Sequence, residues 1–253
     1  MKVNRRRSDI GIAVLLLFIV AASSAVSQGQ PLDPAAQLEL GMKYYLGQGV
    51  PEDFSKAVEW YAKAATKGNA EAQFLLGMMY VKGQGVQKDR VKAAEWWEKA
   101  AENNHAYAQL YLGMFYIDGK GVTKDFAKGL EWCTKSAAQG NAGAQSYLGW
   151  MYATGEGVPQ DHAKAVEWLT KAAEKGVADA QCNLGMVYNA GKGVNKDAVQ
   201  AHFWYSVAEA GGALQAGANL VILEKEMTPS QIAEAKRLAH AFKLGKSANP
   251  SPN

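Results

Sequence analysis

Residues 72–101 have the sequence AQFLLGMMYVKGQGVQKDRVKAAEWWEKAA, and this stretch decides the fold. In its first half, Ala72, Leu76, Gly77 and Tyr80 follow one another at helical spacing. Apolar and small residues at this spacing share one face of a helix. The first half therefore predicts a helix that buries this face.

The second half of the stretch predicts another helix. The turn Gly83-x-Gly85 ends the first helix, because glycine adopts the left-handed conformation of helix ends without strain. Asp89 is a typical N-cap for the helix that follows. The stripe expected to be buried on this helix consists of Ala93, Trp96, Trp97, Ala100 and Ala101. The stretch is thus a helix-turn-helix unit.

This unit occurs five times at a spacing of 36 residues, in copies 36–71, 72–107, 108–143, 144–179 and 180–215. The glycines of the first helix are Gly41, Gly77, Gly113, Gly149 and Gly185. The N-cap aspartates of the second helix are Asp53, Asp89, Asp125, Asp161 and Asp197. The tryptophans of the second helix, which we expect in the core, are Trp60, Trp96, Trp132, Trp168 and Trp204. One pair of short helices cannot bury both of its faces, so stacked copies are expected to form an all-α solenoid.

The repeated pattern A-x-x-x-L-G-x-x-Y-x-x-G-x-G-V-x-x-D-x-x-K-A-x-x-W-x-x-K-A-A resembles the Sel-one-like repeat family, a relative of the tetratricopeptide repeat. The resemblance covers about 180 residues. It implies an α/α superhelical solenoid of helix-turn-helix repeats that acts as a protein-interaction adaptor, and many bacterial members of the family are exported. Some disulfide-rich members bind or hydrolyse β-lactams, but these carry a cysteine pair in each repeat, which this chain does not.

Residues 216–245 are expected to close the end of the array with capping helices. Thr228-Pro229-Ser230-Gln231 has the sequence of a helix start, with Thr228 as N-cap and Gln231 as its capping-box partner. The apolar face of this helix would cover the last repeat through Ile232, Ala235, Leu238, Ala239 and Phe242. Residues 246–253 are expected to be a disordered tail.

Residues 1–27 have the pattern of a secretory signal peptide. Lys2 and three arginines precede an apolar run from Ile10 to Ala22, and small residues follow with possible cleavage after Ala25 or Ser27. The run is too short for a membrane span, although an uncleaved anchor remains the alternative. We therefore expect an exported protein, periplasmic or secreted, in which residues 28–35 form a short linker.

Composition and charge narrow the function classes. The chain is 48% hydrophobic, which is too much for a disordered protein. Its net charge of +3 comes from 27 basic and 24 acidic residues, and removal of residues 1–27 takes away four bases and one acid. The mature chain is then neutral, which argues against a nucleic-acid partner.

The sequence contains no motif for catalysis, a cofactor or a metal. The Gly-x-Gly turns recur in every copy without a following Gly-Lys-Ser/Thr, and the four histidines are scattered. No Gly-x-Ser-x-Gly or Ser-x-x-Lys is present. Cys133 and Cys182 lie on helices of different copies, so we expect two buried free thiols.

By analogy with tetratricopeptide repeats, the first helices line the concave surface. The candidate groove residues, which vary between copies and include several methionines and aromatics, are Leu75, Met78, Tyr111, Met114, Tyr147, Trp150, Asn183 and Met186. Met42 precedes Met78 in the same column, and the neighbouring column, Lys43, Met79, Phe115, Met151 and Val187, is expected to be core. Large, adaptable side chains suit peptide recognition. The alternative is that the candidate residues pack against the next repeat.

Three functions follow from these observations. The first is a non-enzymatic protein-interaction scaffold in the bacterial cell envelope, with a protein or peptide segment in its groove. The second is a cell-wall or glycan-binding module that uses Tyr111, Tyr147 and Trp150. The third is an enzyme such as a β-lactam hydrolase, which the sequence disfavours because no nucleophile, base or metal set is found.

Overall fold

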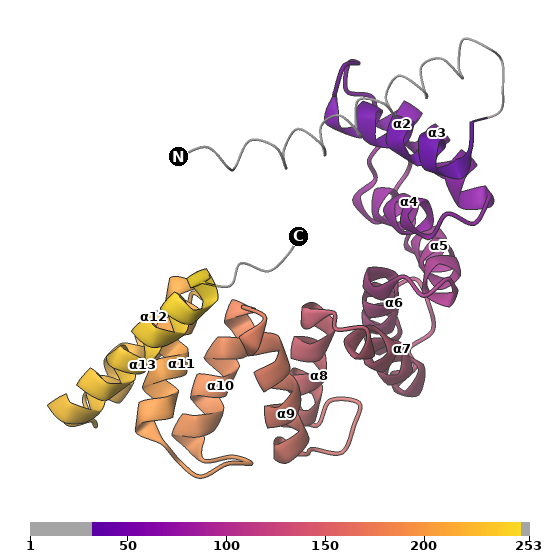
Figure 1. The fold of residues 1–253 in the computed structure, drawn as a ribbon. Helices are drawn as coiled ribbons and strands as arrows, with labels where there is room; N and C mark the ends of the chain where they lie inside the picture. The colour runs from indigo at the N-terminus through magenta and orange to yellow at the C-terminus, as the bar shows by residue number, and fades with distance from the viewer. Residues whose placement is uncertain (1–31, 249–253) are drawn as a thin grey trace, which may run out of the picture. The chain divides into compact units, whose positions relative to one another are not determined.

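The computed structural model describes residues 32–248, and these residues are helical with no strand. They fall into two compact units, one ending at His105 and the other beginning at Ala106. The predicted signal peptide, residues 28–31 of the predicted linker and residues 249–253 lie outside the described residues. Each unit is built from pairs of helices (Figure 1).

Every repeat consists of an A helix and a B helix of 13 residues each. The A helices are α2 (Pro34–Leu46), α4 (Ala70–Lys82), α6 (Ala106–Asp118), α8 (Ala142–Thr154) and α10 (Ala178–Ala190). The B helices are α3 (Phe54–Thr66), α5 (Arg90–Glu102), α7 (Phe126–Ala138), α9 (His162–Glu174) and α11 (Ala198–Ala210). Within each unit an A helix packs against its own B helix and against the B helix of the preceding repeat.

The helix ends follow the sequence pattern. All five predicted N-cap aspartates accept a backbone N–H from the first turn of their B helix, for example from Lys56 to Asp53 at 2.9 Å. Asn104 takes the left-handed conformation, φ 62°, at the position where the other repeats have glycine. A short polar side chain tolerates this conformation better than other side chains do.

The glycines of the A helices allow close contact with the B helices. A Cβ atom on Gly149 would lie 2.6 Å from Cγ of Leu169, and one on Gly41 would lie 2.6 Å from Cδ1 of Tyr61. The side chains that press on the glycines are Tyr61, Trp97, Cys133, Leu169 and Tyr205, and all are buried. The core therefore contains a column of side chains whose type varies between copies.

The expectation of a tryptophan core is wrong for four of the five copies. Trp204 is buried, but Trp60, Trp96, Trp132 and Trp168 are half-buried. Each precedes the core side chain by one position and so points about 100° away from it around the helix. A lysine three residues later covers the ring in all four, as Lys63 covers Trp60 at 3.9 Å from the ring centre.

A column of buried glutamines ties successive repeats together. Its members are Gln37, Gln73, Gln109, Gln145 and Gln181. The Nε2 atom of Gln73 donates to the carbonyl of Ala65 on the preceding B helix at 3.0 Å, and Gln145 and Gln181 make the equivalent bond. Each of these carbonyls, at the end of a B helix, also accepts the N–H of the glycine that follows the helix, so the glutamine adds a second donor.

The second unit ends with α12 (Ala216–Glu224) and α13 (Pro229–Ala248). The capping box at the start of α13 forms, because the N–H of Thr228 donates to Oε1 of Gln231 at 2.9 Å and the N–H of Gln231 donates to Oγ1 of Thr228 at 3.3 Å. Phe242 packs edge-on against Phe203 and Trp204 of α11 with ring centres 5.6 and 5.8 Å apart. The apolar face of α13 thus covers α11.

Two predicted boundaries differ in the structure. The first helix begins at Pro34, inside the predicted linker, because Asp33 accepts the N–H of Ala36 and Pro34 stands at the first helical position. Helix α13 continues to Ala248, three residues into the predicted tail. No proline occurs between Pro229 and Pro250, so no strong helix breaker ends the helix before Ala248.

The two cysteines are buried free thiols. Burial raises the pKa of Cys133 to about 12, and burial also raises the pKa of Cys182. Such thiols pack as small apolar side chains.

Candidate binding surface

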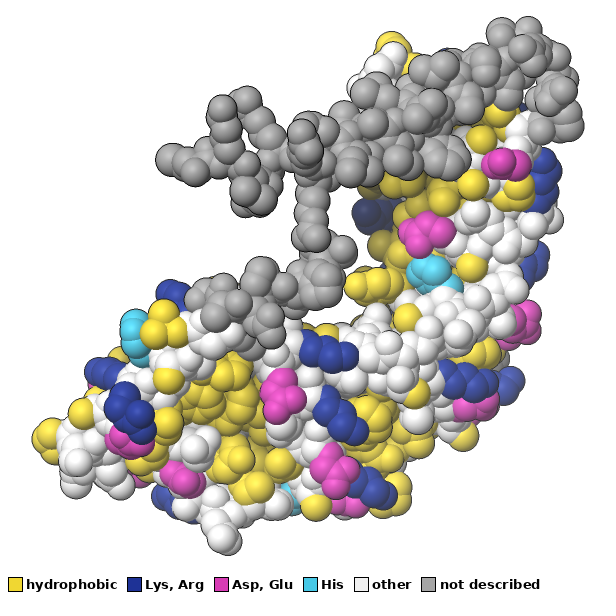
Figure 2. Space-filling view, viewed as in Figure 1, with side chains coloured by type: hydrophobic (Ala, Val, Ile, Leu, Met, Phe, Trp, Pro, Cys, Tyr) yellow, Lys and Arg dark blue, Asp and Glu magenta, His cyan; other side chains and the backbone are white. Residues whose placement is uncertain are grey.

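The first unit contains an apolar pocket of about 250 Å³ between α2 and α4. Its lining comes mainly from these two A helices, with Tyr61 from α3 and Gln84 from the turn after α4. The full lining is Met42, Tyr45, Leu46, Tyr61, Phe74, Leu75, Met78, Met79, Lys82 and Gln84. Hydrophobic side chains appear on the viewed face of this unit near α4 (Figure 2).

The rim of the pocket is open to solvent. Met42 and Leu46 follow each other at a spacing of four residues on α2 and are 42% and 52% exposed. Leu75 and Met78 on α4 are half-buried. Side chains at this spacing share a helix face, so two A helices present apolar side chains to one hollow.

Two polar side chains interrupt the apolar lining. Lys82 lies in the last turn of α4 and is exposed. The Oε1 atom of Gln84 is buried and has no hydrogen-bond partner. A buried acceptor without a donor is costly.

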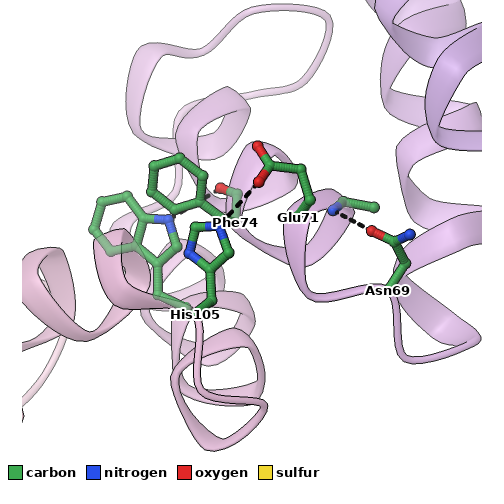
Figure 3. Close-up of polar contacts among 6 residues, drawn as sticks. Asn69, Glu71, Phe74 and His105 are labelled. Carbon is green, nitrogen blue, oxygen red and sulfur yellow. Dashed lines mark hydrogen bonds and ion pairs between the residues drawn. The ribbon is translucent and has the colours of Figure 1, made fainter. Parts of the chain in front are cut away.

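Aromatic and charged side chains support the pocket wall at Phe74. The His105 ring stacks on Phe74 with ring centres 4.7 Å apart (Figure 3). The Nε2 atom of His105 donates to Oε2 of Glu71 at 3.0 Å, and this bond lowers the pKa of Glu71. The indole N–H of Trp97 donates to the carbonyl of Phe74 at 3.1 Å. Phe74 is therefore held in place by a ring on one side and a hydrogen bond at its backbone.

The candidate groove residues of the second unit are arranged differently. Tyr147 and Trp150 stack on each other with ring centres 5.4 Å apart. Together with Met114 they pack against the buried cluster that contains Met151, and burial is the main cause of the raised pKa of Tyr147. These three side chains are half-buried, so they are neither a free surface nor full members of the core.

The other candidates of the second unit are not among the hydrophobic side chains packed against that cluster. Tyr111 is half-buried, and Met186 is 42% exposed on α10. Asn183 lines a hollow of about 530 Å³ with Asp179, Cys182 and residues 212–215. The structure thus brings Leu75 and Met78 into one pocket, and Met114, Tyr147 and Trp150 into one cluster.

Several of the pocket residues were not predicted from the sequence. Tyr45 and Leu46 stand at positions where the other copies have unrelated residues. Phe74 stands in a column with Leu38, Leu110, Ser146 and Cys182, so no repeated aromatic residue marks it. Lys82 and Gln84 lie beside the turn glycines and read as ordinary loop residues. The available signal was the apolar spacing of Met42 and Leu46 on the first helix.

The described residues meet neither the requirements of a metal site nor those of a membrane-spanning helix. Within residues 32–248, no three His, Cys, Asp or Glu side chains gather as a group that could hold a metal ion. None of the helices described is both long and apolar enough to cross a membrane.

Helix pairs repeated every 36 residues, with glycine contacts between A and B helices, define an α-helical repeat solenoid. The chain belongs to the Sel1 repeat family, whose profile matches residues 34–69, 70–105, 106–141, 142–177 and 178–212. These matches begin with the A helices, two residues before the copies defined above, and leave α12 and α13 outside.

Two solved structures support this assignment. The chain is similar to a Sel1 repeat protein from Oxalobacter formigenes, with 36% identity over 82% of this chain and 85% of that chain and a TM-score of 0.73. It is also similar to c5321, a protective antigen present in uropathogenic Escherichia coli strains displaying an SLR fold. That likeness has 29% identity over 92% of this chain and 58% of that chain, with a TM-score of 0.58. Among curated proteins no significant match is found.

Proposed function

We propose that this chain is a non-enzymatic interaction module that holds an apolar side chain of a partner's peptide segment in the pocket of the first unit. Sel1 repeat proteins generally act as protein–protein interaction scaffolds. The observation that carries the proposal is the pocket itself, with its rim of exposed Met42 and Leu46. When a partner covers apolar side chains that are exposed at a hollow, their removal from water lowers the free energy of the complex.

The size and polar groups of the pocket favour a peptide over a small molecule. Pockets for drug-sized ligands usually have about 300–1,000 Å³. A hollow of about 250 Å³ suits one large side chain, such as leucine, methionine or phenylalanine. Rotation of the Gln84 side chain would expose its unpaired Oε1 to a backbone N–H of the segment. Lys82 would favour an acidic residue near the anchor.

We place this function in the bacterial cell envelope, with the periplasm as the first choice. Residues 1–27 have the order of charges, apolar run and small residues of a signal peptide. Cell fractionation and N-terminal sequencing test the location. The chain should accumulate outside the cytoplasm with a new N-terminus at Val26 or Gln28. Recovery in the cytoplasm with residues 1–27 intact would contradict the proposal.

The pocket is tested by selecting binders from a random peptide library on the purified protein. We expect the selected peptides to share one large apolar residue. Met42→Glu should weaken their binding at least about tenfold, because a carboxylate at the rim must be desolvated on binding.

Met186→Glu is the matched control. Met186 stands in the same column and is exposed to the same extent, 42%, but it does not line the pocket. Its replacement should leave binding unchanged. Equal losses in both variants, or a selection without an apolar consensus, would remove the pocket as the binding site.

A further inference from the structure

Helix α12 is the A helix of a sixth repeat that lacks its B helix. Ala216 and Leu220 keep the repeat register, since they follow Ala180 and Leu184 by 36 residues, and both are buried. The helix that follows, α13, packs against α11 instead of taking the B position beside α12. One side of α12 is therefore left without the helix that covers it in every other repeat.

The sequence gives a reason for this departure. Val221 occupies the position of the contact glycines, 36 residues after Gly185. In the five repeats this glycine lets a B-helix side chain approach closely, as Tyr205 approaches Gly185. A β-branched side chain fills that space, so a B helix cannot dock at the usual distance.

The uncovered side of α12 is apolar. Val221 is 61% exposed and Ile222 is 60% exposed, while Leu214, in the turn just before the helix, is 99% exposed. Terminal repeats of a solenoid normally present a polar outer face, which keeps the array soluble. Three large apolar side chains at the end of the array depart from that rule.

Charged residues stand at the two ends of this apolar stripe. Lys225 follows Val221 by four residues, lies on the same side of the helix and is exposed. Asp179 is exposed in the first turn of α10 and lines the same hollow as Leu214. Glu226, in the turn after the helix, is also exposed beside Lys225. On the side of Val221, the stripe thus has a cation at one end and an acid at the other.

We infer that α12 is a self-association surface, on which a second copy of this chain docks its own α12 in antiparallel orientation. A two-fold axis through the middle of the helix would place Val221 and Ile222 of both copies against each other. It would also bring Lys225 of each copy to the Leu214 end of the other, where Asp179 lies. This charge pattern matches itself, as the interface of a symmetric dimer requires.

The dimer is expected to be weak. Stable interfaces bury about 800 Å² on each partner, and a helix of nine residues offers less. Sedimentation velocity of the purified protein, in the form that the cell accumulates, should show a monomer–dimer equilibrium with a dissociation constant on the order of micromolar. A chain that stays monomeric into the high micromolar range would overturn the inference.

Substitutions locate the interface. Val221→Glu should weaken the dimer at least about tenfold, because it places a charge at the centre of the contact. Leu214→Glu should do so as well, and it leaves the helix itself unchanged. Val91→Glu is the matched control, since Val91 is 55% exposed on α5 of the first unit. Circular dichroism checks that each variant keeps its helix content. A dimer that survives Leu214→Glu and Val221→Glu overturns the assignment to α12.

A charge exchange tests the orientation. Lys225→Glu and Asp179→Lys should each weaken the dimer several-fold, because each places like charges opposite one another. The double variant restores opposite charges and should regain most of the affinity. Failure of the double variant to recover would exclude the antiparallel arrangement.

Discussion

At the scale of single residues, the fold depends on the absence of a side chain at one position of each A helix. A Cβ atom on Gly77 would meet the indole ring of Trp97 and would lie 3.1 Å from the carbonyl oxygen of Ala93. Trp97 is buried and also donates a hydrogen bond, so it cannot move away freely. This position therefore tolerates glycine and little else.

Gly77→Ala should lower the free energy of unfolding by about 1–3 kcal/mol, the usual cost of overpacking a core. Gly245→Ala on α13 is the matched control, since its added Cβ would meet no atom within 4 Å. That change should be neutral or stabilise by about 0.4–1 kcal/mol, because alanine favours helix. Urea unfolding of both variants checks the pair. Equal effects would show that the glycine contact is not what the position requires.

The tryptophan column shows why a residue that recurs in every copy need not be buried. Trp96 recurs in every copy but is half-buried beneath Lys99, whereas Trp97 stands at a variable position and is buried. A repeated residue can be maintained by a local contact within its own helix, here a lysine over a ring. A core position can vary when its partner is glycine, because the volume may differ from copy to copy. The recurrence of a residue at one repeat position therefore does not show whether that residue is buried.

At the scale of the helix, the N-cap aspartates connect the repeat pattern to pH. The pKa values of Asp53 and Asp161 are lowered first of all by the backbone N–H groups of Lys56 and Lys164, which donate to the carboxylates. A carboxyl group with a lowered folded-state pKa contributes stability that is complete above its unfolded pKa, near 3.8. That contribution is lost as the pH falls through the lower folded-state value.

The double variant Asp53→Asn, Asp161→Asn should therefore lose less stability than the parent chain between pH 5 and about pH 2. Asparagine caps a helix in the same geometry but carries no charge. Melting temperatures measured across this pH range check the prediction. Parallel curves for both proteins would show that these two caps do not contribute to the acid sensitivity.

At the scale of the whole molecule, the sequence predicts the repeated part well and the unrepeated parts poorly. Five copies in register were sufficient to place the helix pairs, their caps and the left-handed Asn104. The pocket depends on the rings of Tyr45 and Phe74, and the other copies have no aromatic residue at these positions, so no pattern could indicate them. On the exposed face of α12, Val221 stands where the five copies have glycine, and the repeat pattern did not indicate where α13 packs. The repeated pattern thus predicts the features that the copies share, whereas the pocket and the exposed face of α12 depend on residues that differ between copies.

Helix α13 covers part of α11, where it packs instead of forming the B helix of a sixth repeat beside α12. Phe242 packs on Phe203 and Trp204, and both of these rings are buried. Phe242→Ala should lower the free energy of unfolding, by less than the ~3–5 kcal/mol of a fully buried ring, because Phe242 itself is half-buried. Leu244→Ala on the same helix is the control, since Leu244 is 55% exposed. Chemical denaturation should show a clearly larger loss for Phe242→Ala. Equal losses would mean that α13 does not stabilise the last repeat through this aromatic contact.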